Sequence, residues 1–309
     1  MIRLTTILLL LPALLLGGCI GTSKSTSFQG PPPPEIGSDT DPEQQLENLP
    51  FDSLLARADE HVTKGNFELA LIHYNQALVR DPESVKALTG LGNLFWKQGN
   101  ANSAQKAFAQ ALEFDAQNIE VLIGIGRTLR VQNALEKSEE YLARAVETAP
   151  QNLEALTELA IVYDYRSLYQ RAEPIYRQIC ELDSEKSAPL NNLGFNLLLQ
   201  TRYADALIPL QKALAKAPQD TQIKNNLAIA YMLSGDESRG MGLFENTVGQ
   251  AGAWNNLGYV YLTQGEWDDA TRAFNKALEL DPVFYARAKQ NLQRVEELRH
   301  QTPSPLPIE

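Results

Sequence analysis

A pattern of small residues recurs along this chain at a nearly constant spacing between residues 51 and 282. Five successive intervals are 34 residues long and the sixth is 30, counted between Ala58, Gly92, Gly126, Ala160, Gly194, Ala228 and Gly258. Several copies also end in a proline, as at Asp81-Pro82 and Asp281-Pro282. A fixed period of this length is typical of a repeat architecture, in which each copy is one small structural unit stacked on the next. The chain is therefore predicted to fold as an array of seven repeats, numbered here in chain order.

Each repeat is predicted to be a pair of helices. A small residue where two helices cross lets their backbones approach, apolar residues at helical spacing cover the seam, and proline stops the second helix. One pair cannot bury its apolar face alone, so the prediction is an all-α solenoid of about seven helix pairs over residues 51–282. The first helices would line a concave groove. Residues 283–299 keep a helical spacing of apolar side chains and are predicted to form a C-terminal capping helix.

The period and the small, alanine and proline positions together resemble the tetratricopeptide repeat, over about three quarters of the chain. This resemblance implies a right-handed solenoid. It also implies a groove that binds a partner protein or an extended peptide, and no reaction of its own.

The first 18 residues have the features of a targeting segment. Arg3 precedes an apolar run of 13 residues, Leu4 to Leu16, which is too short to span a bilayer as a helix, where about 20 residues are needed. The sequence Leu16-Gly17-Gly18-Cys19 resembles a bacterial lipobox. The resemblance implies cleavage before Cys19 and acylation of its thiol, and Ile20 after it favours the periplasmic face of the outer membrane. An ordinary cleaved signal with an incidental cysteine is the alternative.

Residues 19–50 are predicted to be a flexible, proline-rich tether. Four prolines at 31–34 are followed by a run of carboxylates: Glu35, Asp39, Asp41, Glu43 and Glu47. Such a segment buries too little apolar surface to offset the entropy of ordering it. Residues 300–309 are predicted to be a disordered tail.

The charge of the chain restricts its partners. A formal net charge of −11 and a pI near 4.9 argue against nucleic acid and against an anionic membrane surface, because an acidic protein releases no counterions there. Membrane contact is expected through the lipid anchor only.

The residues that usually carry catalysis or metal binding are few. The three histidines and two cysteines have no metal-ligand spacing, and no nucleophile elbow or phosphate loop is present in the sequence. His61 is interpreted as a packing residue and Cys180 as an inert thiol at the buried small position of repeat four. The sequence therefore indicates no enzyme and no cofactor.

Asparagine pairs on the predicted first helices of repeats five to seven are the first candidate binding site: Asn191, Asn192, Asn225, Asn226, Asn255 and Asn256. A side-chain amide both donates and accepts, so a row of amides can pair with the backbone of an extended peptide. Similar rows line the groove in some peptide-binding members of the resembled family. The alternative is that Asn is simply frequent at these positions.

The residue after each small residue is predicted to face the groove: Asp59, Asn93, Arg127, Ile161, Phe195, Ile229 and Tyr259. Phe195 and Tyr259 stand beside the asparagine pairs and are predicted to anchor apolar side chains of a partner. Repeats two and three instead offer Lys86, Lys97, Arg127 and Arg130. These four predict a site for an acidic ligand, or else are ordinary surface charge.

Repeat six is predicted to be the least stable repeat. Its second helix contains Gly240 and Gly242, and its junction with repeat seven is four residues shorter than the others. Gly249 and Gly252 bracket that junction, so the helix is expected to end early.

The lipobox, the proline-rich tether, the Asn-Asn-Leu sequences and the shortened last junction resemble TadD-type lipoproteins of tight-adherence (Flp) pilus assembly. That resemblance implies an outer-membrane scaffold that helps a secretin or other pilus components assemble. The alternatives are a type IV pilus pilotin, and an adaptor that recruits periplasmic proteases or peptidoglycan enzymes.

Overall fold

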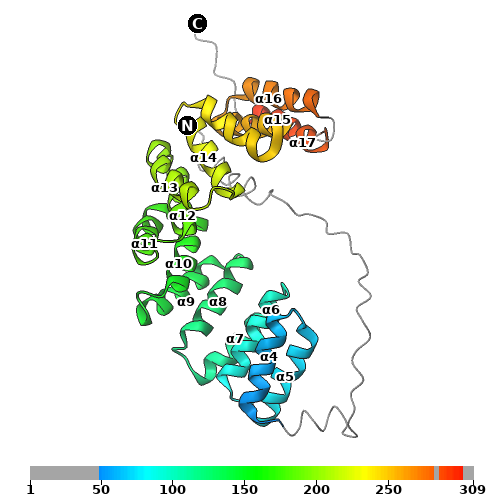
Figure 1. Cartoon of the computed structure of the whole chain (residues 1–309), viewed down its shortest axis with the longest axis vertical. Coiled ribbons are helices and arrows are strands. Elements are labelled where there is room, and N and C mark those ends of the chain that lie inside the picture. Colours follow the sequence, from blue (N-terminus) through cyan, green and yellow to red (C-terminus); the bar gives the residue numbers. More distant parts are fainter. Residues whose placement is uncertain (1–48, 282–284, 302–309) are drawn as a thin grey trace. The chain divides into compact units, whose positions relative to one another are not determined.

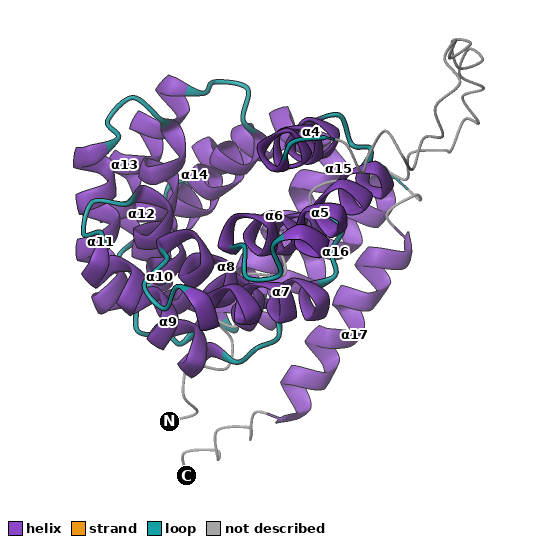
Figure 2. Ribbon diagram, turned by 90° about the horizontal axis from the view of Figure 1, so that it is seen from below, coloured by secondary structure: helices purple, strands orange, loops and turns teal. Residues whose placement is uncertain are grey.

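The computed structural model describes residues 49–281 and 285–301. All regular structure in these residues is α-helical (Figures 1 and 2). The described residues fall into two compact units, one ending at Leu182 and the other beginning at Asp183, and each is treated by itself. The predicted signal peptide, Cys19 and nearly all of the predicted tether lie outside the described residues.

The unit that ends at Leu182 contains four helix pairs, which are repeats one to four (Figure 1). The pairs are α4 (Phe51–Thr63) with α5 (Phe67–Arg80), α6 (Val85–Lys97) with α7 (Ala101–Phe114), α8 (Ile119–Val131) with α9 (Leu135–Thr148), and α10 (Leu153–Tyr165) with α11 (Tyr169–Leu182). Each helix packs on its partner, and the helices of the first three pairs also pack on the first helix of the next pair.

The unit that begins at Asp183 contains repeats five to seven and one further helix. Its helices are α12 (Ser187–Leu199), α13 (Tyr203–Lys216), α14 (Thr221–Leu233), α15 (Glu237–Gln264), α16 (Trp267–Leu280) and α17 (Tyr285–Gln301). The predicted fold class, helix-pair repeats with a C-terminal helix, is confirmed. α17 extends through His300 and Gln301, which the sequence assigned to the tail.

α15 combines the second helix of repeat six with the first helix of repeat seven. Gly249 interrupts it with φ 72° and ψ 175°, so the backbone breaks at this residue and the next helix begins at once. The early end of the second helix of repeat six, expected from its glycines, is therefore observed.

The small residues lie where helices cross, as the sequence predicts. A Cβ built on Gly92 would lie 2.5 Å from the ring of Phe108 on the following helix, and a Cβ on Gly124 of the next repeat would meet the same ring at 2.5 Å. Phe108 is fully buried between the two glycines. Gly258 and Phe274 repeat this relationship in the last pair, where the separation would be 2.7 Å.

The turn inside each pair uses a left-handed residue at the same position. These residues are Gly65, Gly99, Asn133, Ser167, Thr201, Gly235 and Gly265. Their φ values are all positive, and for the three non-glycine residues φ lies between 58° and 61°. Only glycine adopts this conformation without steric cost, and the cost is largest for a β-branched residue such as Thr201.

α17 closes the second unit by covering the apolar edge of repeat seven. Val295 is 2% exposed and packs with Tyr259, Leu262 and Phe274, while Ala288 of the same helix is fully buried. Terminal repeats need such a cap with one polar face. Of the predicted cap residues, Val283 and Phe284 lie outside the described residues.

Two further points follow from the burial pattern. The small buried position of repeat four is occupied by Ile179 and not by Cys180, which is only half-buried, so that assignment was wrong by one residue. Burial raises the pKa of the Cys180 thiol to about 11, so the thiol stays protonated at neutral pH.

Among the described helices, none combines the length and the apolar character that crossing a membrane requires.

Candidate partner-binding groove

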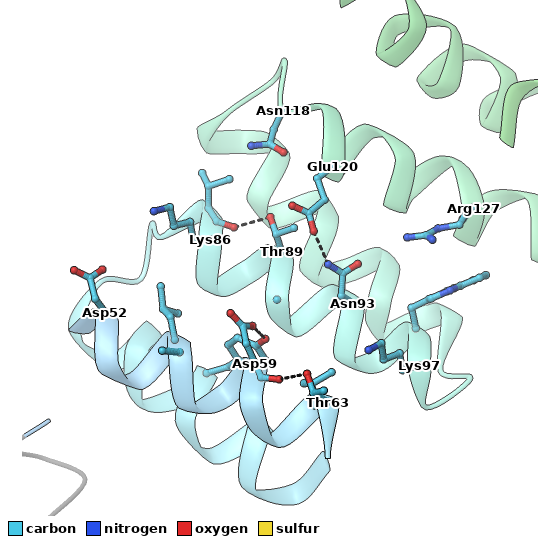
Figure 3. Close-up of a pocket in the computed structure, with 17 residues that line it drawn as sticks. Asp52, Asp59, Thr63, Lys86, Thr89, Asn93, Lys97, Asn118, Glu120 and Arg127 are labelled. Atoms are coloured by element: carbon cyan, nitrogen blue, oxygen red, sulfur yellow. Dashed lines mark hydrogen bonds between the residues drawn. The ribbon is translucent and has the colours of Figure 1, made fainter. Parts of the chain in front are cut away.

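A groove of about 710 Å³ lies between α4, α6 and α8, the first helices of repeats one to three (Figure 3). Six of its lining residues come from α4 and seven from α6, and Asn118, Glu120 and Arg127 close it on the side of α8. Tyr74 of α5 forms part of its floor. Asp59, Asn93 and Arg127, which the repeat pattern predicts to face a groove, all line it.

One side of the groove is a polar stripe on α6. Lys86, Asn93 and Lys97 lie seven and eleven residues apart, close to whole helical turns, so they share one face of the helix. Both lysines are exposed, and neither forms an ion pair with any residue in the described ranges. Two ammonium groups therefore remain open to a ligand.

The carboxylates of the groove are more strongly engaged than its lysines. Tyr74 donates its hydroxyl hydrogen to Oδ1 of Asp59 over 2.5 Å, and Asn93 donates its amide to Oε1 of Glu120 over 2.7 Å. Burial, and then the nearby Asp59 carboxylate, raise the pKa of Tyr74 well above its usual value, so the hydroxyl remains a donor.

Arg127 lies over the indole ring of Trp96, with 5.4 Å between the guanidinium carbon and the ring centroid. Its NH1 also donates to Oε1 of Glu154 over 2.9 Å. Both contacts hold the guanidinium in place, and Arg127 lines the groove. Arg130, the fourth predicted cation, does not line the groove. It pairs with Glu158 at 3.0 Å and lies over Tyr165, so its assignment to the patch was wrong.

Two of these contacts are the same contact in successive repeats. Asn93 bonds Glu120 and Arg127 bonds Glu154, and each pair is separated by 27 residues. The equivalent pair one repeat earlier is Asp59 and Lys86. There Asp59 accepts from Tyr74 instead, so Lys86 is left without the inter-repeat contact that its counterparts make. The 27-residue spacing of these pairs is visible in the sequence. Only the structure shows that the Asp59–Lys86 pair does not make the contact.

The asparagine pairs of repeats five to seven form a different kind of contact from the predicted one. Nδ2 of Asn226 donates to Oδ1 of Asn191 over 2.8 Å, and Nδ2 of Asn291 on α17 donates to Oδ1 of Asn255 over 2.9 Å. Asn226 is 0%, Asn255 5% and Asn191 6% exposed. The expectation that these three amides lie on an open face was wrong: Asn191 and Asn226 join repeats five and six, and Asn255 joins repeat seven to α17.

The other predicted residues of that site are only partly accessible. Asn192, Asn256 and Phe195 are half-buried, and Asn225 accepts a hydrogen bond from the Thr247 hydroxyl over 3.1 Å. Tyr259 is buried beside Phe274, and burial raises its pKa. A role in partner binding stays a prediction for the half-buried residues. Ile229, predicted to face a groove, is also buried.

Within the residues that the structure describes, no group of three or more His, Cys, Asp or Glu is placed to hold a metal ion. The groove between α4, α6 and α8 offers charged groups, amides and one indole ring. This combination suits recognition of a polypeptide by charge and hydrogen bonding.

Stacked helix pairs with a groove on their first helices define the class of α-helical repeat proteins that bind partners through an inner surface. Sequence profiles of the tetratricopeptide repeat match residues 55–119, 95–161 and 251–284. Residues 55–161 and 251–284 of the chain therefore carry tetratricopeptide repeats.

Individual relatives agree with this assignment. A chloroplastic tetratricopeptide repeat domain-containing protein of Arabidopsis thaliana, PYG7, is 31% identical over 125 residues, which are 38% of this chain and 41% of the plant protein. The match thus spans about two fifths of that relative's length.

Two solved structures share the fold. A tetratricopeptide repeat protein from Parabacteroides merdae has a TM-score of 0.60 at 20% identity and covers 80% of this chain and 98% of its own. The pilF protein of Pseudomonas aeruginosa has a TM-score of 0.57 at 17% identity, over 67% of this chain and 92% of its own. At these identities the likeness shows the fold alone.

Proposed function

We propose that this chain is a lipid-anchored scaffold of the bacterial outer membrane that holds an extended segment of a partner protein in the groove between α4, α6 and α8. The observation that carries the proposal is the open pair of ammonium groups, Lys86 and Lys97, on one face of α6 beside the Arg127–Trp96 stack. Unpaired cations spaced along a groove favour a partner segment that carries carboxylates.

The membrane location is supported by the sequence around Cys19, where an apolar run of 13 residues ends in Leu-Gly-Gly-Cys. Acylation there would place the repeats in the periplasm at the end of the predicted tether.

The partner we propose is a component of the Flp/Tad pilus or its secretin. This part of the proposal is supported by the resemblance of the lipobox, tether and shortened last junction to TadD-type lipoproteins. The fold is shared with pilF of Pseudomonas aeruginosa, which adds no residue-level support at 17% identity.

The test is a charge reversal in the groove. A variant with Lys86→Glu and Lys97→Glu is expected to keep its helical content and membrane fractionation and to lose pilus or secretin assembly in a strain that lacks the native gene. The matched control reverses two exposed lysines on second helices, Lys106→Glu on α7 and Lys137→Glu on α9, and is expected to restore assembly. If both variants support assembly equally, the groove does not hold the partner.

A further inference from the structure

We propose that the acidic segment of this chain, residues 35–47, occupies the groove between α4, α6 and α8 when no partner is bound. The proposal rests on the function proposed above for that groove. It makes the segment an internal competitor that a partner must displace.

The segment has the charge that the groove selects. It contains five carboxylates, and no lysine or arginine stands between Lys24 and Arg57. The groove presents the Lys86 and Lys97 ammonium groups without ion pairs among the described residues, whereas the Asp59 and Glu120 carboxylates already accept hydrogen bonds from the protein. Asp52 is the remaining carboxylate, and it lies on the α4 side of the groove (Figure 3).

The part of the chain that the structure describes begins close to the groove. The carbonyl oxygen of Leu49, the first described residue, accepts a hydrogen bond from Arg80. Three residues later, Asp52 already lines the groove. Glu47 is therefore only five residues before a residue that lines the groove.

Residues 35–47 are long enough to reach both lysines of the groove. Lys86 and Lys97 are eleven residues apart on one helix, or about 16 Å at 1.5 Å per residue. Twelve residue steps separate Glu35 from Glu47, and an extended chain covers about 40 Å in that number of steps. The carboxylates can thus pass both lysines in one extended stretch. Because the segment is tethered, its effective concentration at the groove is in the millimolar range, so weak contacts are enough for substantial occupancy.

Zero-length crosslinking tests the contact directly. A carbodiimide joins a carboxylate to an amine only where the two touch. The full chain is treated in detergent, digested and examined by mass spectrometry. Crosslinks are expected from Lys86 or Lys97 to residues 35–47, well above those from Lys106 and Lys137. If the four lysines react equally with the segment, the proposal is overturned. Mixing isotopically labelled and unlabelled chains shows whether a crosslink forms within one chain or between two chains. Crosslinks that form between different chains would also overturn the proposal.

A second measurement uses a fluorescent synthetic peptide that copies residues 35–47. The variant Glu35→Gln, Asp39→Asn, Asp41→Asn, Glu43→Gln, Glu47→Gln should bind this peptide at least ten-fold more tightly than the unmodified chain, whose groove is occupied. Adding Lys86→Glu and Lys97→Glu should abolish that gain. If the unmodified chain and the variant with the five carboxylates replaced bind the peptide equally well, the proposal is contradicted.

The two proposals fail in different ways. If pilus assembly needs Lys86 and Lys97 but neither the crosslinks nor the peptide effect is found, only the internal competitor is wrong. If crosslinks form but the lysine reversals leave assembly intact, the groove binds the segment and the proposed partner function is wrong.

Discussion

The side-chain amide of Asn226 on α14 donates a hydrogen bond to Oδ1 of Asn191 on α12, 2.8 Å away. Both side chains are buried, and the two helices belong to successive repeats. The contact makes this asparagine pair part of what holds repeat five against repeat six.

Replacement of Asn226 by Ala should therefore destabilise the protein and not merely alter its surface. The substitution leaves the buried Oδ1 of Asn191 without its donor, which typically costs about 1–3 kcal/mol. Urea unfolding followed by circular dichroism measures the change. The half-buried Asn192→Ala is the control and should cost less than about 0.5 kcal/mol. Equal stability of the two variants would show that the amide contact contributes nothing.

Thr201 is the turn residue with the least suitable side chain. It has φ 60°, a conformation that costs a β-branched residue about 1 kcal/mol or more relative to glycine. Thr201→Gly should raise the free energy of unfolding by about 1 kcal/mol. Gly99→Ala, at φ 75° in the equivalent turn, should lower it by a similar amount. A stability loss in Thr201→Gly would mean that the threonine makes a compensating contact.

The two glycines in the second helix of repeat six should respond in opposite directions to alanine. A Cβ on Gly242 meets nothing within 4 Å, so Gly242→Ala should stabilise the helix by about 1 kcal/mol. A Cβ on Gly240 would lie 2.9 Å from the carbonyl oxygen of Ala228, so Gly240→Ala should destabilise it. Amide hydrogen exchange over residues 237–248 reports the local effect, and parallel changes in both variants would contradict it.

Repeat one should lose stability in mild acid. The imidazole rings of His61 and His73 stack with centroids 5.2 Å apart, and Nδ1 of each is buried without a hydrogen bond among the described residues. Burial, and then the charges of His61 and Arg57, lower the pKa of His73. The unfolded state thus binds the proton more tightly than the folded state, so stability is full above pH 6.5 and falls as the pH drops below it.

The substitution His73→Phe keeps an aromatic ring stacked on His61 and removes the group that takes up the proton. Its urea midpoint should change less between pH 8 and pH 5 than that of the native chain. The same pH dependence in both proteins would assign the acid sensitivity to other groups.

Cys19 is predicted to carry the lipid. Cys19→Ser should abolish incorporation of labelled palmitate and release the repeats from the membrane fraction, because a lipid chain is the only anchor predicted for the chain. The control Cys180→Ser should keep both. Labelled lipid on the Cys19→Ser protein would exclude the lipobox interpretation.

The repeat pattern predicted most of the fold because it fixes which residues lie at helix crossings. Gly92 and Gly258, two of the small residues that the spacing places at helix crossings, lie against Phe108 and Phe274 in the structure. The same spacing correctly placed Asp59, Asn93 and Arg127 in a groove.

The orientation of the asparagine pairs could not be predicted in this way. Adjacent helical residues point about 100° apart, so the packing angle of the neighbouring repeat decides which amide of a pair is buried. Asn191 is the first of its pair and Asn226 the second, yet both are buried. The left-handed turn position was hidden because Asn133, Ser167 and Thr201 replace glycine there.

The backbone of Gly249 has φ 72° and ψ 175°, a conformation that essentially only glycine adopts. Every missense change in the first or second base of a glycine codon adds a side chain. In a library of all single substitutions, position 249 should therefore be depleted of variants that assemble the last repeat and its cap. The exposed neighbour Gln250 should accept most residues. The attachment of the C-terminal end of the array thus depends on one codon.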